Sequence, residues 1–394
     1  MLSVKVVGVG AAGNKAAIKL IEDGVVSEND VVLLNSTLKD VPQQYKDLAT
    51  EIKGSQGCAK ERKRAQKIIV ENLKTSNIAL DTIAEQNDAF VIIVTSVEGG
   101  TGSGVSTVIA KYFSEVLERH VHMFAFTGFE DDLHGLKNTV DWFSELKPEY
   151  VVEAISNKAF LEEANGNKLK AQEMANQEFS NRVRILIGKT IGESEENIDD
   201  ADLFKLDVTP GFMTIERKEL NVKNIDEFNK QITDMIDYSK SLTTEASAHR
   251  IGVILSINDR IRDNIDWTFQ TIRNRYVGKI VDDFFTHVQP DIHGKNEIEL
   301  IVAGMKMPID EVRSVYQNFK ESTENANTLK DDFFKSMGEM NTEGSENLSD
   351  YSAGKMNPAD LQSRRASFFT GVGPAIPVKT TGAQNIKKIA KENF

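Results

Sequence analysis

A glycine-rich stretch, Gly99-Gly100-Thr101-Gly102-Ser103-Gly104, contains the residue types that bind phosphate groups. It follows the apolar, β-branched run 90–97, which is typical of a strand buried on both faces, and precedes residues 105–117, which are apolar at helical spacing. Glycines let the backbone approach a ligand closely, and the free amides at a helix start favour an anion. We interpret this stretch as a phosphate-binding loop. The alternative is a tight strand-to-helix turn whose glycines serve packing.

A second glycine motif, Gly8-Val9-Gly10-Ala11-Ala12-Gly13, lies between an expected strand at 4–9 and an expected helix at 14–21. The pattern G-x-G-x-x-G suggests a dinucleotide site, which also needs an acidic residue at the end of the next strand. The next strand, 31–34, is instead followed by Asn35. A P-loop would place Lys directly after Gly13, where this chain has Asn14. Neither pattern fits well, and an NAD-dependent oxidoreductase stays open as an alternative.

Acidic residues gather in Asn197-Ile198-Asp199-Asp200-Ala201-Asp202. The carboxylates of Asp199 and Asp202, three residues apart and near Asn197, suit the orientation of a water or a cation. An ordinary acidic loop explains the same residues equally well.

Other polar positions favour structural roles. His120 and His122 alternate on the expected strand 121–126, but no third ligand lies nearby in sequence, so we predict surface histidines and no metal site. A basic helix begins with Lys60, Arg62, Lys63 and Arg64. These side chains could approach phosphates, but the pattern favours a solvated helix face. Ile298, Leu300 and Val302 alternate with Glu297 and Glu299, which predicts a sheet with one wet face.

Length and composition limit the class of protein. The 394 residues are enough for two domains, and 40% hydrophobic with 27% charged residues is typical of a soluble globular protein. The formal net charge of −13 argues against non-specific DNA binding by the body of the molecule. The single cysteine, Cys58, fits a reducing compartment, and no signal peptide or membrane span is evident. We expect a cytoplasmic protein without direct membrane contact.

The glycine-rich elements resemble those of the tubulin/FtsZ superfamily. The resemblance depends on residues 99–104, which look like the tubulin signature GGTGSG, and covers residues 1 to about 305 in element order. It implies an α/β fold: a Rossmann-like parallel-sheet GTPase domain, a long central helix, a second smaller α/β domain, and a C-terminal helix with a flexible tail. On this division residues 1–167 bind GTP, 168–206 form the central helix and catalytic loop, 207–307 the second (activation) domain, 308–340 the long C-terminal helix and 341–394 the basic tail.

The same resemblance implies roles for individual residues. Those expected to bind GTP or GDP are Gly10, Ala11, Ala12, Asn14, Asn35, Gly99, Gly100, Thr101, Gly102, Ser103, Asn157 and Asn176, with Mg²⁺ on the phosphates. Asn197, Asp199 and Asp202 match the family's catalytic N-x-D-x-x-D loop. That loop acts on the nucleotide of the next subunit, so the implied activity is GTP hydrolysis completed between subunits of a head-to-tail homopolymer.

The chain departs from the family pattern at several positions. Gln172 stands where relatives stack an aromatic residue on guanine, Glu98 replaces the first glycine of the FtsZ version, and the loop 127–135 aligns poorly. The C-terminal helix and basic tail are most similar to the TubZ-type segregation tubulins of plasmids and phages, whose tail engages a DNA-bound adaptor. This predicts a filament that segregates plasmid or phage DNA. An FtsZ-like division GTPase and a phage-centring filament are the alternatives.

Overall fold

The computed structural model of the chain describes residues 2–54, 57–78, 80, 90–129, 131–192, 198–220, 225–242, 248–257, 265–276, 282–291, 296–322, 364–366 and 368–369. The strands are β1 Val4–Val9, β2 Val31–Asn35, β3 Ala49–Glu51, β4 Phe90–Ser96, β5 Val121–Thr127, β6 Val151–Ser156, β7 Gly211–Leu220, β8 Arg250–Ile257, β9 Asp283–Pro290 and β10 Asn296–Met305. The α-helices are α1 Gly10–Glu22, α2 Arg62–Lys74, α4 Gly100–Glu115, α5 Leu133–Ser144, α6 Lys168–Leu186, α7 Asp200–Asp207, α8 Ile225–Asp237, α10 Ile265–Tyr276 and α11 Ile309–Ser322. A short 3₁₀ turn, η3 Asn157–Phe160, follows β6.

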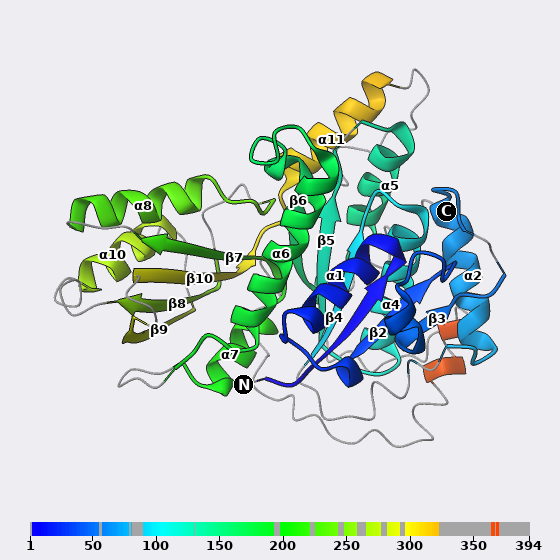
Figure 1. The fold of residues 1–394 in the computed structure, drawn as a ribbon, viewed down its shortest axis with the longest axis horizontal. Coiled ribbons are helices and arrows are strands. Elements are labelled where there is room, and N and C mark those ends of the chain that lie inside the picture. The colour runs from blue at the N-terminus through cyan, green and yellow to red at the C-terminus, as the bar shows by residue number, and fades with distance from the viewer. Residues whose placement is uncertain are drawn as a thin grey trace, which may run out of the picture.

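One mixed sheet runs through the whole molecule. Its strand order is β3-β2-β1-β4-β5-β6-β7-β10-β8-β9. All pairs from β3 to β7 are parallel, whereas β10 is antiparallel to both β7 and β8. Helix α6 lies between the lobe built on β1–β6 and the lobe that carries α8 and α10 (Figure 1). The predicted α/β fold, with a parallel sheet in the first lobe, a long central helix and a second smaller lobe, is confirmed.

Alternation along the central strands builds a core on each face of the sheet. Val7, Ile93 and Met123 belong to one buried cluster, which also contains residues of α2, α4 and α5. Val6, Ile92 and Phe124 point the other way and pack with residues of α1 and α6. Because helices cover both faces, the strands are apolar on both sides, as the continuous apolar runs predict.

The predictions that His122 and Arg62 face solvent are wrong, because both side chains are buried. The ring of His122 is fully buried on β5 and stacks on Phe124 with centroids 4.6 Å apart, and burial lowers the pKa of His122 to about 3. Arg62 is also buried, and its guanidinium donates to the carboxylate of Glu145, the C-cap of α5, and to Thr107 Oγ1 on α4. His122 is therefore a core residue, and Arg62 joins three helices.

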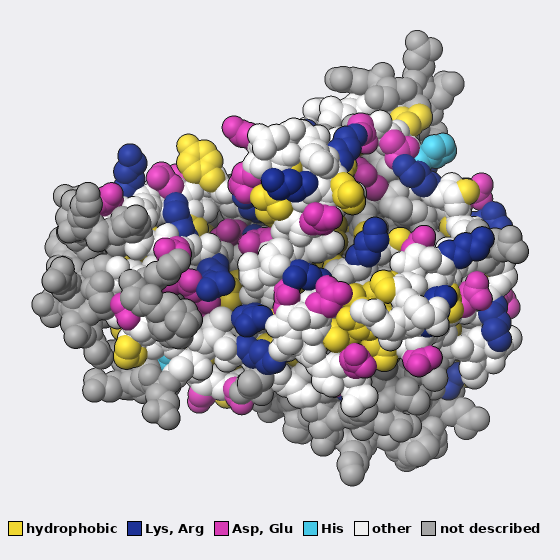
Figure 2. All heavy atoms as spheres, in the orientation of Figure 1, with side chains coloured by type: hydrophobic (Ala, Val, Ile, Leu, Met, Phe, Trp, Pro, Cys, Tyr) yellow, Lys and Arg dark blue, Asp and Glu magenta, His cyan; other side chains and the backbone are white. Residues whose placement is uncertain are grey.

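The outer surface carries charges of both signs. Figure 2 shows lysine, arginine and acidic side chains interspersed over the face drawn, without one dominant sign. None of the helices in the described ranges is long and apolar enough to cross a membrane.

Candidate active site

The predicted phosphate loop lies where the sheet topology reverses. Strand β1 pairs in parallel with β2 on one side and β4 on the other, with Val9 opposite Thr95. Helix α1 begins directly after β1 and packs on one face of the sheet, whereas α4 begins after β4 and packs on the other face. The two helix starts diverge from adjacent strands, and such a switch point at the carboxyl edge is where open α/β sheets bind ligands.

The two glycine loops touch through their backbones. Gly10 adopts φ +74°, and a Cβ there would lie 3.0 Å from the amide nitrogen of Gly102. A Cβ on Gly13 would lie 2.2 Å from the carbonyl oxygen of Val94 on β4. Only glycine permits this approach, which places the first amides of α1 and α4 side by side. We name the two loops together, residues 10–14 and 99–103, the cradle.

Polar groups next to the cradle are buried and partly unpartnered. The hydroxyls of Ser36 and Thr101 are 2.8 Å apart, which joins the end of β2 to the cradle. The side-chain Oδ1 of Asn35 accepts from the Ser36 amide at 2.9 Å, but its Nδ2 has no hydrogen-bond partner among the described residues. Asn14 is 2% exposed, and within the same residues neither its Oδ1 nor its Nδ2 is paired. Each unpaired buried group costs about 1–3 kcal/mol, so these amides suit a polar ligand that pairs with them.

Residues just before α2 and at the start of α5 border the cradle at Gly100. Residues Ala59 and Lys60, just before α2, have φ of 47° and 62°, and the Lys60 backbone lies over Gly100. The ammonium of Lys60 pairs with Asp132, the N-cap of α5. Burial favours the neutral acid, but Lys60 and the amides of His134 and Gly135 outweigh it and hold the pKa of Asp132 below its ordinary value. The side-chain Nδ2 of Asn138 donates hydrogen bonds to the carbonyls of Lys60 and Glu98, at 3.0 Å each, and so holds these two backbone segments together.

Two further predicted GTP-binding residues lie on neighbouring elements. Asn157 is the first residue of η3 and is buried directly after β6, and Asn176 is half-buried in the middle of α6. The turn η3 packs on α6, and α6 packs on α1. Neither asparagine forms a hydrogen bond with the described residues of the cradle, so their contact with a nucleotide stays a prediction. Gln172 is exposed one turn before Asn176.

The acidic loop begins a helix. The Asp199 carboxylate is the N-cap of α7 and accepts from the amides of Ala201 and Asp202 at 2.8 and 2.9 Å. The Asp202 side chain accepts from the Asp199 amide at 3.5 Å, which completes a capping box. Asp199 is exposed and Asp202 is half-buried, so both also face solvent. Asn197 lies outside the described residues.

The acidic loop and the cradle lie at opposite ends of the strands. The acidic loop is at the amino ends of the central strands, and the cradle is at the carboxyl ends of β1 and β4. Helix α7 packs on β8 and β10, and its Phe204 meets the ring of His120, just before β5 begins, with centroids 5.6 Å apart. The cradle lies past the carboxyl ends of β1 and β4. Strands of this length span about 20 Å, so the acids of one chain do not reach its own cradle.

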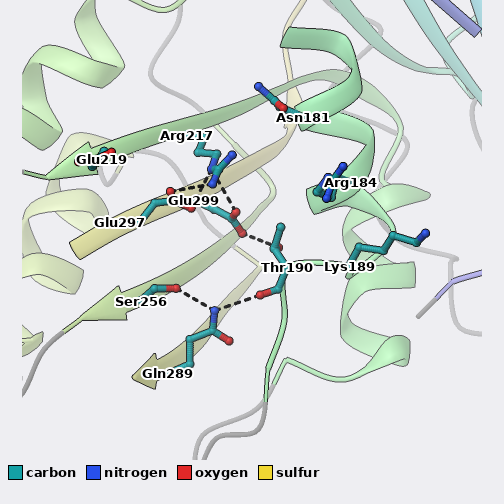
Figure 3. A pocket seen from close by; sticks show the side chains of 10 residues that line it. All are labelled: Asn181, Arg184, Lys189, Thr190, Arg217, Glu219, Ser256, Gln289, Glu297 and Glu299. Carbon is teal, nitrogen blue, oxygen red and sulfur yellow. Dashed lines mark hydrogen bonds and ion pairs between the residues drawn. The ribbon is translucent and has the colours of Figure 1, made fainter. Parts of the chain in front are cut away.

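A separate hollow lies between the end of α6 and the sheet of β7–β10 (Figure 3). It has a volume of about 540 Å³ and contains no cradle residue. Gln289 donates to the carbonyl of Thr190 at 3.0 Å, and the Thr190 hydroxyl donates to Glu299 at 2.6 Å. These bonds fix the segment that leads from α6 toward the acidic loop. The predicted wet face is therefore wrong at Glu299, which is 3% exposed because this segment covers it, and burial raises the pKa of Glu299 to about 7.

Solved structures of other proteins share this architecture, whereas no protein-family model matches the chain. A protofilament of Bacillus thuringiensis serovar israelensis TubZ in its GTPγS form superposes with TM-score 0.67 at 19% identity, covering 81% of this chain and 91% of that one. The GDP-bound monomer of CetZ1 from Haloferax volcanii gives 0.62 at 19% identity, covering 82% and 99%. TubZ of Clostridium botulinum phage c-st gives 0.59 at 14% identity, covering 81% and 97%. At these identities the similarity is one of fold.

Proposed function

We propose that this chain, which has the tubulin/FtsZ fold, is a GTPase that polymerises head to tail and hydrolyses GTP between subunits. The observation that carries the proposal is the separation of the cradle and the acidic loop, which lie at opposite edges of one sheet. In a head-to-tail stack the carboxyl edge of one copy faces the opposite edge of the next, so one copy's acids meet the other's cradle. Such a contact is heterologous and does not close, so it propagates as a filament.

The cradle would hold the triphosphate. The exposed amides at the starts of α1 and α4 are donors for phosphate oxygens, and Asn14 and Asn35 carry the unpaired polar atoms described above. Within the described ranges no group of three histidine, cysteine or acidic side chains could hold a metal ion. Mg²⁺ would therefore arrive on the nucleotide, held mainly by phosphate oxygens and water. The TubZ and CetZ structures named above are of GTPγS and GDP forms, which supports guanine as the base.

The acidic loop would supply the groups that act on water. Phosphoryl transfer depends mostly on positioning and charge, so a carboxylate that orients or deprotonates the attacking water suffices. Asp199 and Asp202 are the candidates, with Asn197 as the third member predicted from the sequence. Their capping bonds fix the direction in which both carboxylates face. Hydrolysis would then weaken the contact between subunits.

Sedimentation tests polymerisation. We expect the full chain to pellet with GTP or a slowly hydrolysed analogue and to stay in the supernatant with GDP. Equal pelleting in all three would contradict a nucleotide-dependent polymer.

Asp199→Asn separates capping from catalysis, because Asn caps a helix as well as Asp does. We expect unchanged thermal stability, GTP binding and pelleting, but GTP turnover slower by about 10² or more. Asp202→Asn should behave alike. Asp200→Asn, an exposed carboxylate in the same turn, is the control and should keep normal turnover. Normal turnover in both Asp199→Asn and Asp202→Asn would remove these acids from the mechanism.

The basic C-terminal tail supports a role in moving plasmid or phage DNA through a DNA-bound adaptor. From Tyr351 onward the chain has Lys355, Arg364, Arg365, Lys379, Lys387, Lys388 and Lys391 against Asp360 and Glu392. One of the similar structures belongs to a phage protein. Truncation before Tyr351 should spare polymerisation and abolish adaptor–DNA binding in a gel shift. An unchanged shift would refute this role, and recovery of a membrane adaptor by the tail would favour a division protein.

A further inference from the structure

A short piece of the C-terminal tail lies against the body of the molecule. The described residues 364–366 and 368–369 include two arginines and two phenylalanines, and both phenylalanine side chains pack against the core cluster that contains α2 and α4. Phe368 and Phe369 also contact each other edge to face, with centroids 5.3 Å apart. This piece of the tail therefore presents to the body two phenylalanine rings in contact, preceded by two positive charges.

The surface beneath this segment matches it in shape and charge. The ring of Phe368 meets the edge of Tyr112 near the end of α4, with centroids 5.4 Å apart, and the ammonium of Lys111 lies 5.7 Å from the Phe368 centroid. Arg364 forms an ion pair with Glu118, just past α4. Arg365 Nη2 lies 3.5 Å from Ser76 Oγ, just past α2. Apolar contact in the centre and polar contacts at the rim are the usual layout of a specific interface.

The chain's own connection makes this segment the favoured occupant. Helix α11 packs on α5, in the same lobe as α4, and ends at Ser322. Residues 323–363 join that helix to Arg364 in the sequence, so the segment and the surface beneath it belong to one covalent chain. Docking within one chain is an intramolecular event, which is favoured over docking of a second copy at low protein concentration.

We propose that the ends of α4 and α2 form a docking site for residues 364–366 and 368–369 of the same chain, which hold the tail on the body of the monomer. The site lies at the end of α4 remote from the cradle, so seating needs no nucleotide. While seated, Arg364 and the phenylalanines are withheld from any other acidic or apolar partner. The inference concerns the free monomer and stands independently of the GTPase proposal.

Hydroxyl-radical footprinting of the full chain without nucleotide tests the docking site, read by mass spectrometry at Phe369. In the parent chain we expect Phe369 to be oxidised several-fold more slowly than in urea. Phe368→Ala removes the ring that meets Tyr112, and should raise oxidation of Phe369 by about threefold or more. Glu118→Arg should act in the same direction, and Arg364→Glu in that background should restore protection. Lys391→Glu, the same change of charge elsewhere in the tail, is the control and should change nothing.

Three results would overturn the proposal. One is oxidation of Phe369 in the parent chain at the rate seen in urea. Another is protection that survives both Phe368→Ala and Glu118→Arg. The third is protection that disappears on dilution of the protein, because the segment would then come from a second copy. Circular dichroism of each variant shows whether a change at Phe369 reflects undocking or loss of fold.

Discussion

At the scale of single residues, the most informative feature is the unpaired side-chain amides of Asn14, in the cradle, and Asn35, next to it. Asn14 is buried without a partner in the described part of the chain, whereas Asn138 is buried with two. The first arrangement is costly unless a ligand supplies the missing bonds. The two asparagines therefore form a matched pair for mutation: Asn138 makes bonds within the fold, and we propose that Asn14 serves a ligand.

Asn14→Ala should leave the free energy of unfolding without nucleotide nearly unchanged, because no bond within the protein is lost. It should weaken GTP binding about tenfold. Asn138→Ala should instead destabilise the nucleotide-free protein by about 1–3 kcal/mol, since the carbonyls of Lys60 and Glu98 both lose a donor. Thermal unfolding with and without GTP measures both. A large loss of stability in Asn14→Ala without nucleotide would show that Asn14 serves the fold.

Glu299 predicts a pH dependence of stability. Its pKa is raised to about 7 in the folded protein, against about 4.3 in an unfolded chain, so the folded state holds the proton more tightly. The stability from this group is fully present below pH of about 4 and is lost as the pH rises to about 7. Glu299→Gln stays neutral and keeps an acceptor for Thr190. Chemical unfolding measures the free energy of unfolding between pH 4.5 and 7. With rising pH this free energy should fall less steeply in the variant than in the parent, and the two slopes should differ by up to about 1.4 kcal/mol per pH unit. An identical slope would contradict burial of this carboxyl.

At the scale of elements, backbone contacts through glycine join the helices to the sheet. Gly13→Ala would place a methyl group against the carbonyl oxygen of Val94, 2.2 Å away, and this backbone atom cannot rotate aside as a side chain can. We expect destabilisation by about 3 kcal/mol. Gly99→Ala is the control, because Gly99 has φ −74° and no atom lies within 4 Å of an added Cβ. Denaturant unfolding of the two variants checks the difference, and equal stability would contradict the close approach of α1 to β4.

The sequence predicts elements better than it predicts their partners. The motif at residues 99–104 and the apolar runs around it are local signals, and they place the strand, loop and helix of the cradle. The burial of Arg62 depends on Glu145, which is 83 residues away, and no local pattern announces that pair. His122 and Glu299 are mispredicted because an alternating pattern does not say whether a helix or a loop covers the polar face. The capping box at Asp199 and Asp202 has a local signature that fits the expected catalytic motif as well.

At the scale of the whole molecule, the most important feature is that the cradle and the acidic loop lie at opposite ends of the strands. The cradle and the acidic loop are rigidly separated by the strands between them, so neither loop movement nor side-chain rotation unites them in one chain. Two subunits stacked in the same direction would unite them at every contact. Under the proposed function the active site would be a property of the assembly, and the GTPase activity would depend on protein concentration.

GTP turnover per chain as a function of protein concentration tests this claim most directly, with pelleting followed in the same samples. We predict negligible turnover per chain below the concentration at which polymer forms, and a steep rise above it. Asp199→Asn should polymerise at the same concentration without the rise in turnover. Full turnover per chain in dilute, strictly monomeric protein would contradict an active site shared between subunits.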